Sequence, residues 1–127
     1  MVNFIWLSAI KMDKDKIKYI LDYYSNFMTE EEGKAWRHWS TEYKMEHSDS
    51  TPQQKESRIK VSLKSGWMST DENILKLLEN GIDEFRRKVA ERIIKSNTIE
   101  FNNCPNCNKL TRTPKAKQCR FCQFDWH

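Results

Sequence analysis

All four cysteines of the chain lie in its last 24 residues, in two closely spaced pairs. Cys104 and Cys107 are separated by two residues, as are Cys119 and Cys122, and eleven residues lie between the pairs. Two residues between thiols allow one tight turn to aim both sulfurs at a single point. Two such turns can supply the four thiolates of a tetrahedral Zn²⁺ site, and Zn²⁺ has no redox chemistry. The spacing therefore predicts one structural Zn²⁺ bound by all four cysteines.

The redox state of these thiols depends on where the protein resides. The apolar N-terminal run lacks the basic start and the cleavage site of a signal peptide. No stretch of the sequence approaches the roughly 20 apolar residues of a membrane span. We therefore expect a soluble, cytoplasmic protein with reduced thiols, which favours metal over disulfides. A dithiol redox protein is the alternative that paired cysteines leave open.

The segments CPNC and CRFC resemble the two knuckles of a zinc ribbon, a four-cysteine module of many transcription, translation and nucleic-acid-processing proteins. Pro105 matches the proline that is common in the first knuckle. Ribbons usually have a glycine directly after the second cysteine of a knuckle, where this chain has Asn108 and Gln123. Residues 1–98 carry no such resemblance. The resemblance implies a β-type tail with four zinc ligands: Cys104, Cys107, Cys119 and Cys122.

The cysteine-rich tail is more basic than the rest of the chain. Residues 99–127 carry five basic and two acidic side chains, a net of +3, whereas residues 1–98 carry 17 basic and 16 acidic ones, a net of +1. Basic side chains contact phosphates, aromatic rings stack on exposed bases, and the hydroxyls of Thr111 and Thr113 add hydrogen-bond donors. We therefore predict a nucleic-acid-binding module. Its contact residues would be Lys109, Arg112, Lys115, Lys117, Arg120, Phe121, Phe124 and Trp126.

A protein-interaction adaptor is the alternative function, with the ribbon as a structural clasp. The chain has five tryptophans, and aromatic residues are enriched at binding hot spots. Trp36, Trp39 and Tyr43 share one face of an expected helix, where they could form either a core or an interface. The sequence leaves both interpretations open.

Catalytic patterns are missing from the sequence. None of the three histidines belongs to an H-E-x-x-H or H-x-E motif. His38 lies one turn before Glu42, which indicates an exposed pair on a helix rather than a catalytic dyad. His127 follows the last cysteine by five residues, and we expect it to be a solvent-exposed end residue rather than a metal ligand. We predict a non-enzymatic protein; the enzyme class left open is a dithiol reductase.

Four helices are expected before the tail, because start signals precede runs of apolar residues at helical spacing. Asp13 caps a helix that runs to about residue 27. Thr29 with Glu32, and Thr51 with Gln54, form capping-box patterns for helices at about 30–47 and 52–65. Residues 4–10 could form a short helix or a buried strand, of which we favour the helix, and residues 99–101 form an extended lead-in to the cysteines.

The last expected helix covers residues 71–95 and starts near Ser69 and Glu72. Gly81 weakens it by about 1 kcal/mol relative to alanine. Its apolar stripe could also support a homodimer. The fold class is therefore mainly α: a domain of three to five helices over residues 1–98, then a β-type zinc ribbon over residues 99–127.

Overall fold

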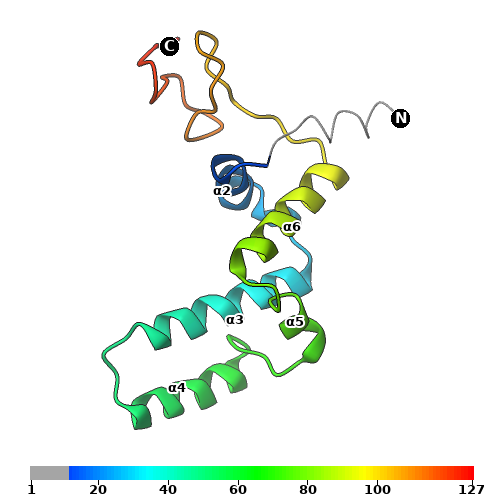
Figure 1. Ribbon diagram of the computed structural model, residues 1–127, viewed down its shortest axis with the longest axis vertical. Helices are drawn as coiled ribbons and strands as arrows, with labels where there is room; N and C mark the ends of the chain where they lie inside the picture. The colour runs from blue at the N-terminus through cyan, green and yellow to red at the C-terminus, as the bar shows by residue number, and fades with distance from the viewer. Residues whose placement is uncertain (1–11) are drawn as a thin grey trace. The chain divides into compact units, whose positions relative to one another are not determined.

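The protein is mainly helical, as predicted. The computed structural model describes residues 12–127 (Figure 1), so the short helix expected at residues 4–10 lies outside the described part. Its helices are α2 (Lys14–Tyr23), the 3-10 turn η1 (Ser25–Phe27), α3 (Glu30–Glu46), α4 (Pro52–Ser65), α5 (Glu72–Lys76) and α6 (Ile82–Ser96). Residues 12–127 contain no β-strand, and only two isolated β-bridges occur, both in the tail. None of these helices is long and apolar enough to cross a membrane.

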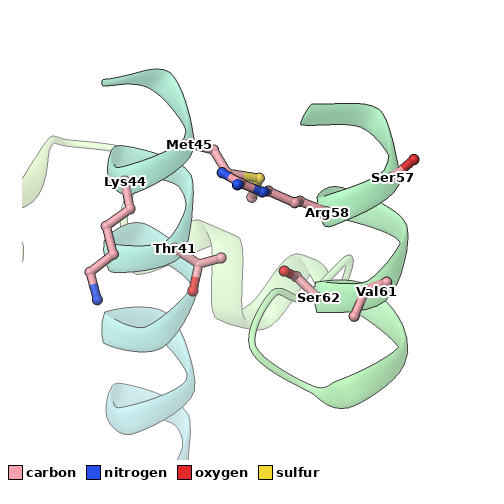
Figure 2. Close-up of a pocket in the computed structure, with 7 residues that line it drawn as sticks. All are labelled: Thr41, Lys44, Met45, Ser57, Arg58, Val61 and Ser62. Atoms are coloured by element: carbon pink, nitrogen blue, oxygen red, sulfur yellow. The ribbon is translucent and has the colours of Figure 1, made fainter. Parts of the chain in front are cut away.

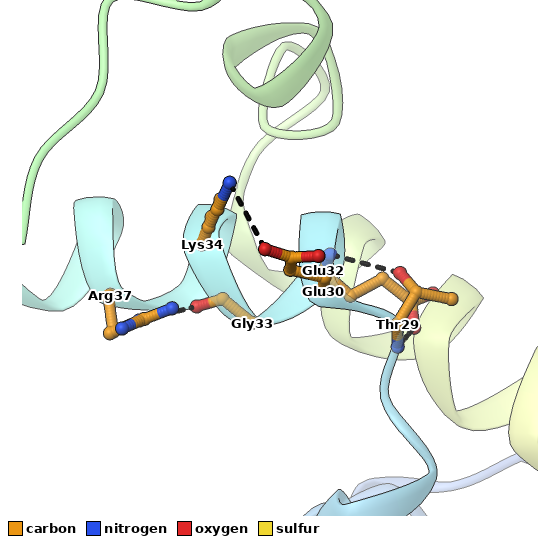
Figure 3. Close-up of polar contacts among 6 residues, drawn as sticks. All are labelled: Thr29, Glu30, Glu32, Gly33, Lys34 and Arg37. Carbon is orange, nitrogen blue, oxygen red and sulfur yellow. Dashed lines mark hydrogen bonds and ion pairs between the residues drawn. The ribbon is translucent and has the colours of Figure 1, made fainter. Parts of the chain in front are cut away.

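The start of α3 is fixed by the predicted capping box (Figure 3). The Glu32 amide donates to the Thr29 hydroxyl at 3.1 Å, and the Thr29 amide donates to the Glu32 carboxylate at 2.9 Å. Two of the amides that a helix start leaves without partners are thereby satisfied. One turn further on, Lys34 pairs with Glu30 at 3.4 Å. The local sequence thus sets where α3 begins.

Helix α4 shows the same local control at both of its ends. Thr51 and Gln54 form the second reciprocal box, and Pro52 occupies the first turn, where its missing N–H costs nothing. Gly66 ends the helix with φ +87°, a left-handed conformation that favours glycine. These predictions are confirmed.

Two predicted helices are shorter in the structure. Helix α2 begins after Asp13, as expected, but it ends at Tyr23, and η1 covers the stretch to Phe27. The helix expected at 71–95 is broken: α5 starts after Asp71 and α6 begins only at Ile82. Gly81 adopts φ +92° between them, so it interrupts the helix rather than weakening it. The continuous stripe that would have carried a homodimer through residues 71–95 therefore does not exist.

The chain divides into two compact units. The first contains α2, most of α6 and the cysteine tail, and the second spans residues 28–85. The first unit's helices are built around buried side chains on α2 and α6: Tyr19, Ile20, Val89, Ala90, Ile93 and Ile94. The domain boundary expected at residues 98/99 stays a prediction, since it concerns which part folds independently.

The second unit has a small core in which α3 packs against α5. Ala35 and Met45 on α3 and Ile74 on α5 are buried. His38 is also buried, which corrects the expectation of an exposed pair: its Nδ1 accepts from the Ser69 amide at 3.0 Å, and its Nε2 lies 3.2 Å from Glu42. A histidine held by both ring nitrogens has a structural role here.

The aromatic residues of α3 lie outside this core. Trp36, Trp39, Tyr43 and His47 stack in sequence along one face, with ring centroids 5.5, 5.0 and 4.0 Å apart. Trp36 and Tyr43 remain 38% and 47% exposed. The core interpretation is therefore wrong for Trp36 and Tyr43, whereas Trp39 is half-buried.

Candidate metal centre

The four cysteines converge on one point. Their sulfur atoms all lie within 4.8 Å of one another, and all four residues are free thiols in the structure. The Sγ atoms of Cys104 and Cys122 are 3.7 Å apart, and those of Cys107 and Cys119 are 3.5 Å apart. A tetrahedron with 2.3 Å from its centre to each sulfur has edges of about 3.8 Å. The cluster therefore has the dimensions of a four-thiolate metal site.

The first knuckle is a tight turn that points amides at its first sulfur. The amides of Asn106 and Cys107 donate to the Cys104 Sγ at 3.3 and 3.4 Å. The Asn108 amide donates to the Cys104 carbonyl and the Cys104 amide to the Lys109 carbonyl, both at 2.8 Å. Asn108 has φ +63°, a conformation that asparagine tolerates. The backbone thus sets the direction of both thiols.

The second knuckle repeats the first bond for bond. The amides of Phe121 and Cys122 donate to the Cys119 Sγ at 3.3 and 3.4 Å. Gln123 donates to the Cys119 carbonyl at 3.1 Å, and Cys119 donates to the Phe124 carbonyl at 2.8 Å. Gln123 has φ +67°. Its backbone therefore adopts the left-handed conformation, although glutamine tolerates this conformation less well than asparagine does.

Each knuckle is closed at its base by one β-bridge. Asn103 pairs with Leu110, and Gln118 pairs with Asp125, so each bridge joins the residue before the first cysteine to the residue six beyond that cysteine. The extended lead-in expected at residues 99–101 forms no strand either. The tail is therefore made of turns and isolated bridges.

The pKa values of the thiols are shifted in opposite directions. A hydrogen bond from the Phe124 backbone, then one from the Asn106 side chain, lowers the pKa of Cys122 to about 6. The backbone N–H of Cys122 likewise lowers the pKa of Cys119. At Cys107 the backbone N–H of Lys109 acts downward, but desolvation and the other three thiols outweigh it and raise the pKa to about 11. Of these three thiols, Cys107 therefore holds its proton most tightly, and metal binding would require it to lose that proton.

Helix α2 holds the start of the tail through two tyrosines. The hydroxyls of Tyr19 and Tyr24 lie 3.5 and 3.3 Å from the Glu100 carbonyl, and the Asn102 amide donates to the Tyr19 oxygen at 3.3 Å. Burial raises the pKa of Tyr19. Asp15 on α2 also pairs with Arg120 of the second knuckle at 3.6 Å. The tail is thus joined to residues that lie far from it in the sequence.

Asn102 and Thr111 order the segment between the knuckles. The Asn102 side-chain amide donates to the carbonyls of Thr113 and Ala116 at 3.0 and 2.8 Å. The Thr111 hydroxyl lies 2.7 and 2.8 Å from the carbonyls of Asn102 and Thr113. Thr111 is buried, so the expectation that its hydroxyl would contact a ligand is wrong. Sequence analysis missed Asn102, Tyr19 and Tyr24, because no local pattern marks contacts across such separations.

The predicted nucleic-acid contacts fall into separate groups. Phe121 is 47% exposed and lies close to two cations, with Lys109 Nζ 4.9 Å and Arg120 Cζ 4.8 Å from its ring centroid. Phe124 stacks on Trp126 at 6.1 Å. Arg112 lines a cleft beside α2 together with Arg120. Lys115 and Lys117 are exposed and belong to none of these groups.

His127 is not among the residues gathered at the sulfur cluster. It is exposed, and its side chain pairs with Asp125. A hydrogen bond from the His127 amide, together with this side-chain pair, keeps the pKa of the Asp125 carboxyl low.

Comparisons with protein-family models, curated protein sequences and solved structures gave no match to this chain.

Proposed function

We propose that this chain is a non-enzymatic zinc-binding protein with one structural Zn²⁺ held by Cys104, Cys107, Cys119 and Cys122. The observation that carries this proposal is the duplicated knuckle, which brings four sulfurs to the separations of a tetrahedral site. Four thiolates fill all positions of a structural Zn²⁺ and leave none open for a substrate.

The ion would supply folding energy that the tail lacks by itself. Within residues 101–127, only Cys104, Thr111 and Cys119 are buried, so the segment has almost no apolar core. Structural zinc commonly substitutes for such a core, and its binding free energy becomes folding free energy. The tail is a zinc ribbon in this proposal, although its chain forms bridges in place of strands.

Metal content and thiol counting on protein purified without added metal test the zinc proposal. We expect one zinc per chain, and four thiols that react with a thiol reagent only after chelation. Protein without metal that contains a readily reversible disulfide would contradict the proposal and support dithiol redox chemistry instead.

We further propose that the protein acts as an interaction adaptor in which the zinc centre is a clasp. Support comes from the second unit, whose apolar side chains are unusually exposed. Helix α4 buries no residue, and Ile59, Val61 and Leu63 are 39%, 66% and 40% exposed. Ile59 and Leu63 lie one helical turn apart and share a face, and contiguous exposed apolar surface is a feature of binding sites.

Nucleic-acid binding by the tail is the second candidate function. The specific observation in its favour is the exposed Phe121 ring with two cations close to it, since aromatic rings contact bases and cations contact phosphates. Arg112, Lys115 and Lys117 would add phosphate contacts nearby.

Charge reversal separates this candidate from the adaptor. If the tail binds a labelled single-stranded oligonucleotide, we expect affinity to fall steeply with salt. The double substitution Arg112→Glu and Lys115→Glu should abolish the binding, measured by fluorescence anisotropy. Reversal of Lys60 on α4, outside the tail, serves as the control. Binding that survives the double substitution would reject this surface.

A further inference from the structure

A groove of about 390 Å³ runs between α3 and α4 (Figure 2). Thr41, Lys44 and Met45 line it from α3, and Arg58, Val61 and Ser62 line it from α4. Arg58 reaches across from α4 toward Met45. The exposed surface of the groove is largely apolar, and Arg58 brings a cation to it from α4.

Helix α4 has capping residues at both ends that favour helix formation, but none of its residues is buried. Isolated helices of about this length are marginal in water, and most helical stability in proteins comes from packing an apolar face. The 14 residues of α4 include no buried one. Its capping box and terminal glycine therefore preform a helix whose apolar side chains are left for a partner to cover.

The charges of this surface select the kind of partner. Helix α4 carries Lys55, Arg58, Lys60 and Lys64 against the single acid Glu56, a net charge of +3. Lys60 pairs with Glu56 at 3.6 Å. No carboxylate of residues 12–127 forms an ion pair with Arg58 or with Lys44 across the groove. Arg58, which extends from α4 toward Met45, is thus available to an incoming anion.

We propose that the α3–α4 groove binds an acidic amphipathic helix of a partner protein. An apolar side chain of that helix would lie between Met45 and Val61, and a flanking carboxylate would pair with Arg58. A second copy of α4 is disfavoured because it would bring a +3 helix against another +3 helix. A nucleic acid offers phosphates but no aliphatic side chain to cover Val61. This inference rests on the adaptor function proposed above and specifies its partner.

Selection from a peptide library tests the proposal without a known partner. Random 16-residue peptides displayed on phage would be selected on the full chain as purified and counter-selected on the Val61→Asp variant. We expect enriched peptides to carry apolar residues at helical spacing and several-fold more Asp and Glu than Lys and Arg. A fluorescein-labelled copy of the best peptide would then be titrated by anisotropy.

We expect Arg58→Glu and Val61→Asp each to weaken that peptide's binding at least tenfold. The matched control Lys60→Glu reverses a charge on the same helix outside the groove, and it should change the affinity less than twofold. Circular dichroism on each variant confirms that the helices persist. Because the groove involves no tail residue, loss of tail binding to oligonucleotides would leave these results unchanged.

Other outcomes would overturn the proposal in distinguishable ways. Selected peptides that are neutral or basic, yet sensitive to Val61→Asp, would keep the adaptor function and reject an acidic partner. A dimer in solution that dissociates on Val61→Asp would assign the groove to a second copy. Oligonucleotide binding that Arg58→Glu abolishes would assign it to nucleic acid. No selected peptide and no dimer would reject both this inference and the adaptor function.

Discussion

Replacing Cys119 with serine is expected to unfold residues 104–127 while the helices of residues 28–85 remain formed. Cys119 is buried, and two backbone amides donate to its sulfur, so it anchors the second knuckle and is one of the four proposed metal ligands. Structural zinc supplies roughly 10–16 kcal/mol of apparent binding free energy in small zinc peptides at neutral pH. A tail with only three buried residues over 101–127 has little to replace that contribution.

Hydrogen exchange, read segment by segment, measures this outcome. Protection should vanish in the tail and persist in α3 and α4, and the bound zinc should fall below one per chain. Lys117→Ala, which removes an exposed side chain from the same segment, is the control and should retain both zinc and protection. Loss of protection throughout α3 and α4 would show that the metal centre supports the whole chain.

Replacing Ile20 with alanine is expected to lower the free energy of unfolding by about 2–5 kcal/mol. Ile20 is fully buried in the first unit, so the change removes packed methyl and methylene groups and leaves a cavity. Ile59→Ala is the matched control: the same substitution on α4, at a side chain 39% exposed, should cost well under 1 kcal/mol. Urea unfolding followed by circular dichroism gives both values. Equal losses for the two variants would contradict the assigned core.

Helix starts were predictable because their determinants are local. Thr29 with Glu32, and Thr51 with Gln54, satisfy helix amides within three residues of sequence. The break at Gly81 was missed because apolar spacing continues on both sides of it. The break is visible only in the backbone, where α5 ends at Lys76 and Gly81 adopts a positive φ before α6.

In the candidate site, too, contacts between residues close in sequence were predictable and contacts between distant residues were not. Cysteine spacing was sufficient to predict the cluster, since each knuckle is a six-residue turn. Its attachment to α2 was not predictable, because Tyr19 and Asn102 are 83 residues apart in the chain. The exposure of the aromatic row on α3 was equally hidden, because helical spacing describes a core face and a solvent-facing stack in the same way.

The first unit is assembled from two distant stretches of chain, and this has a consequence for synthesis on the ribosome. Residues 28–85 form one continuous stretch, so they can complete their contacts while the tail is still being translated. Helix α2 must wait until Glu100 and Asn102 emerge before its tyrosines find their hydrogen-bond partners. In a nascent chain that stops before Cys119, residues 28–85 can therefore be folded while the first unit still lacks part of its chain. The four-sulfur cluster cannot be complete before Cys122 has been synthesised, because that residue supplies its fourth sulfur.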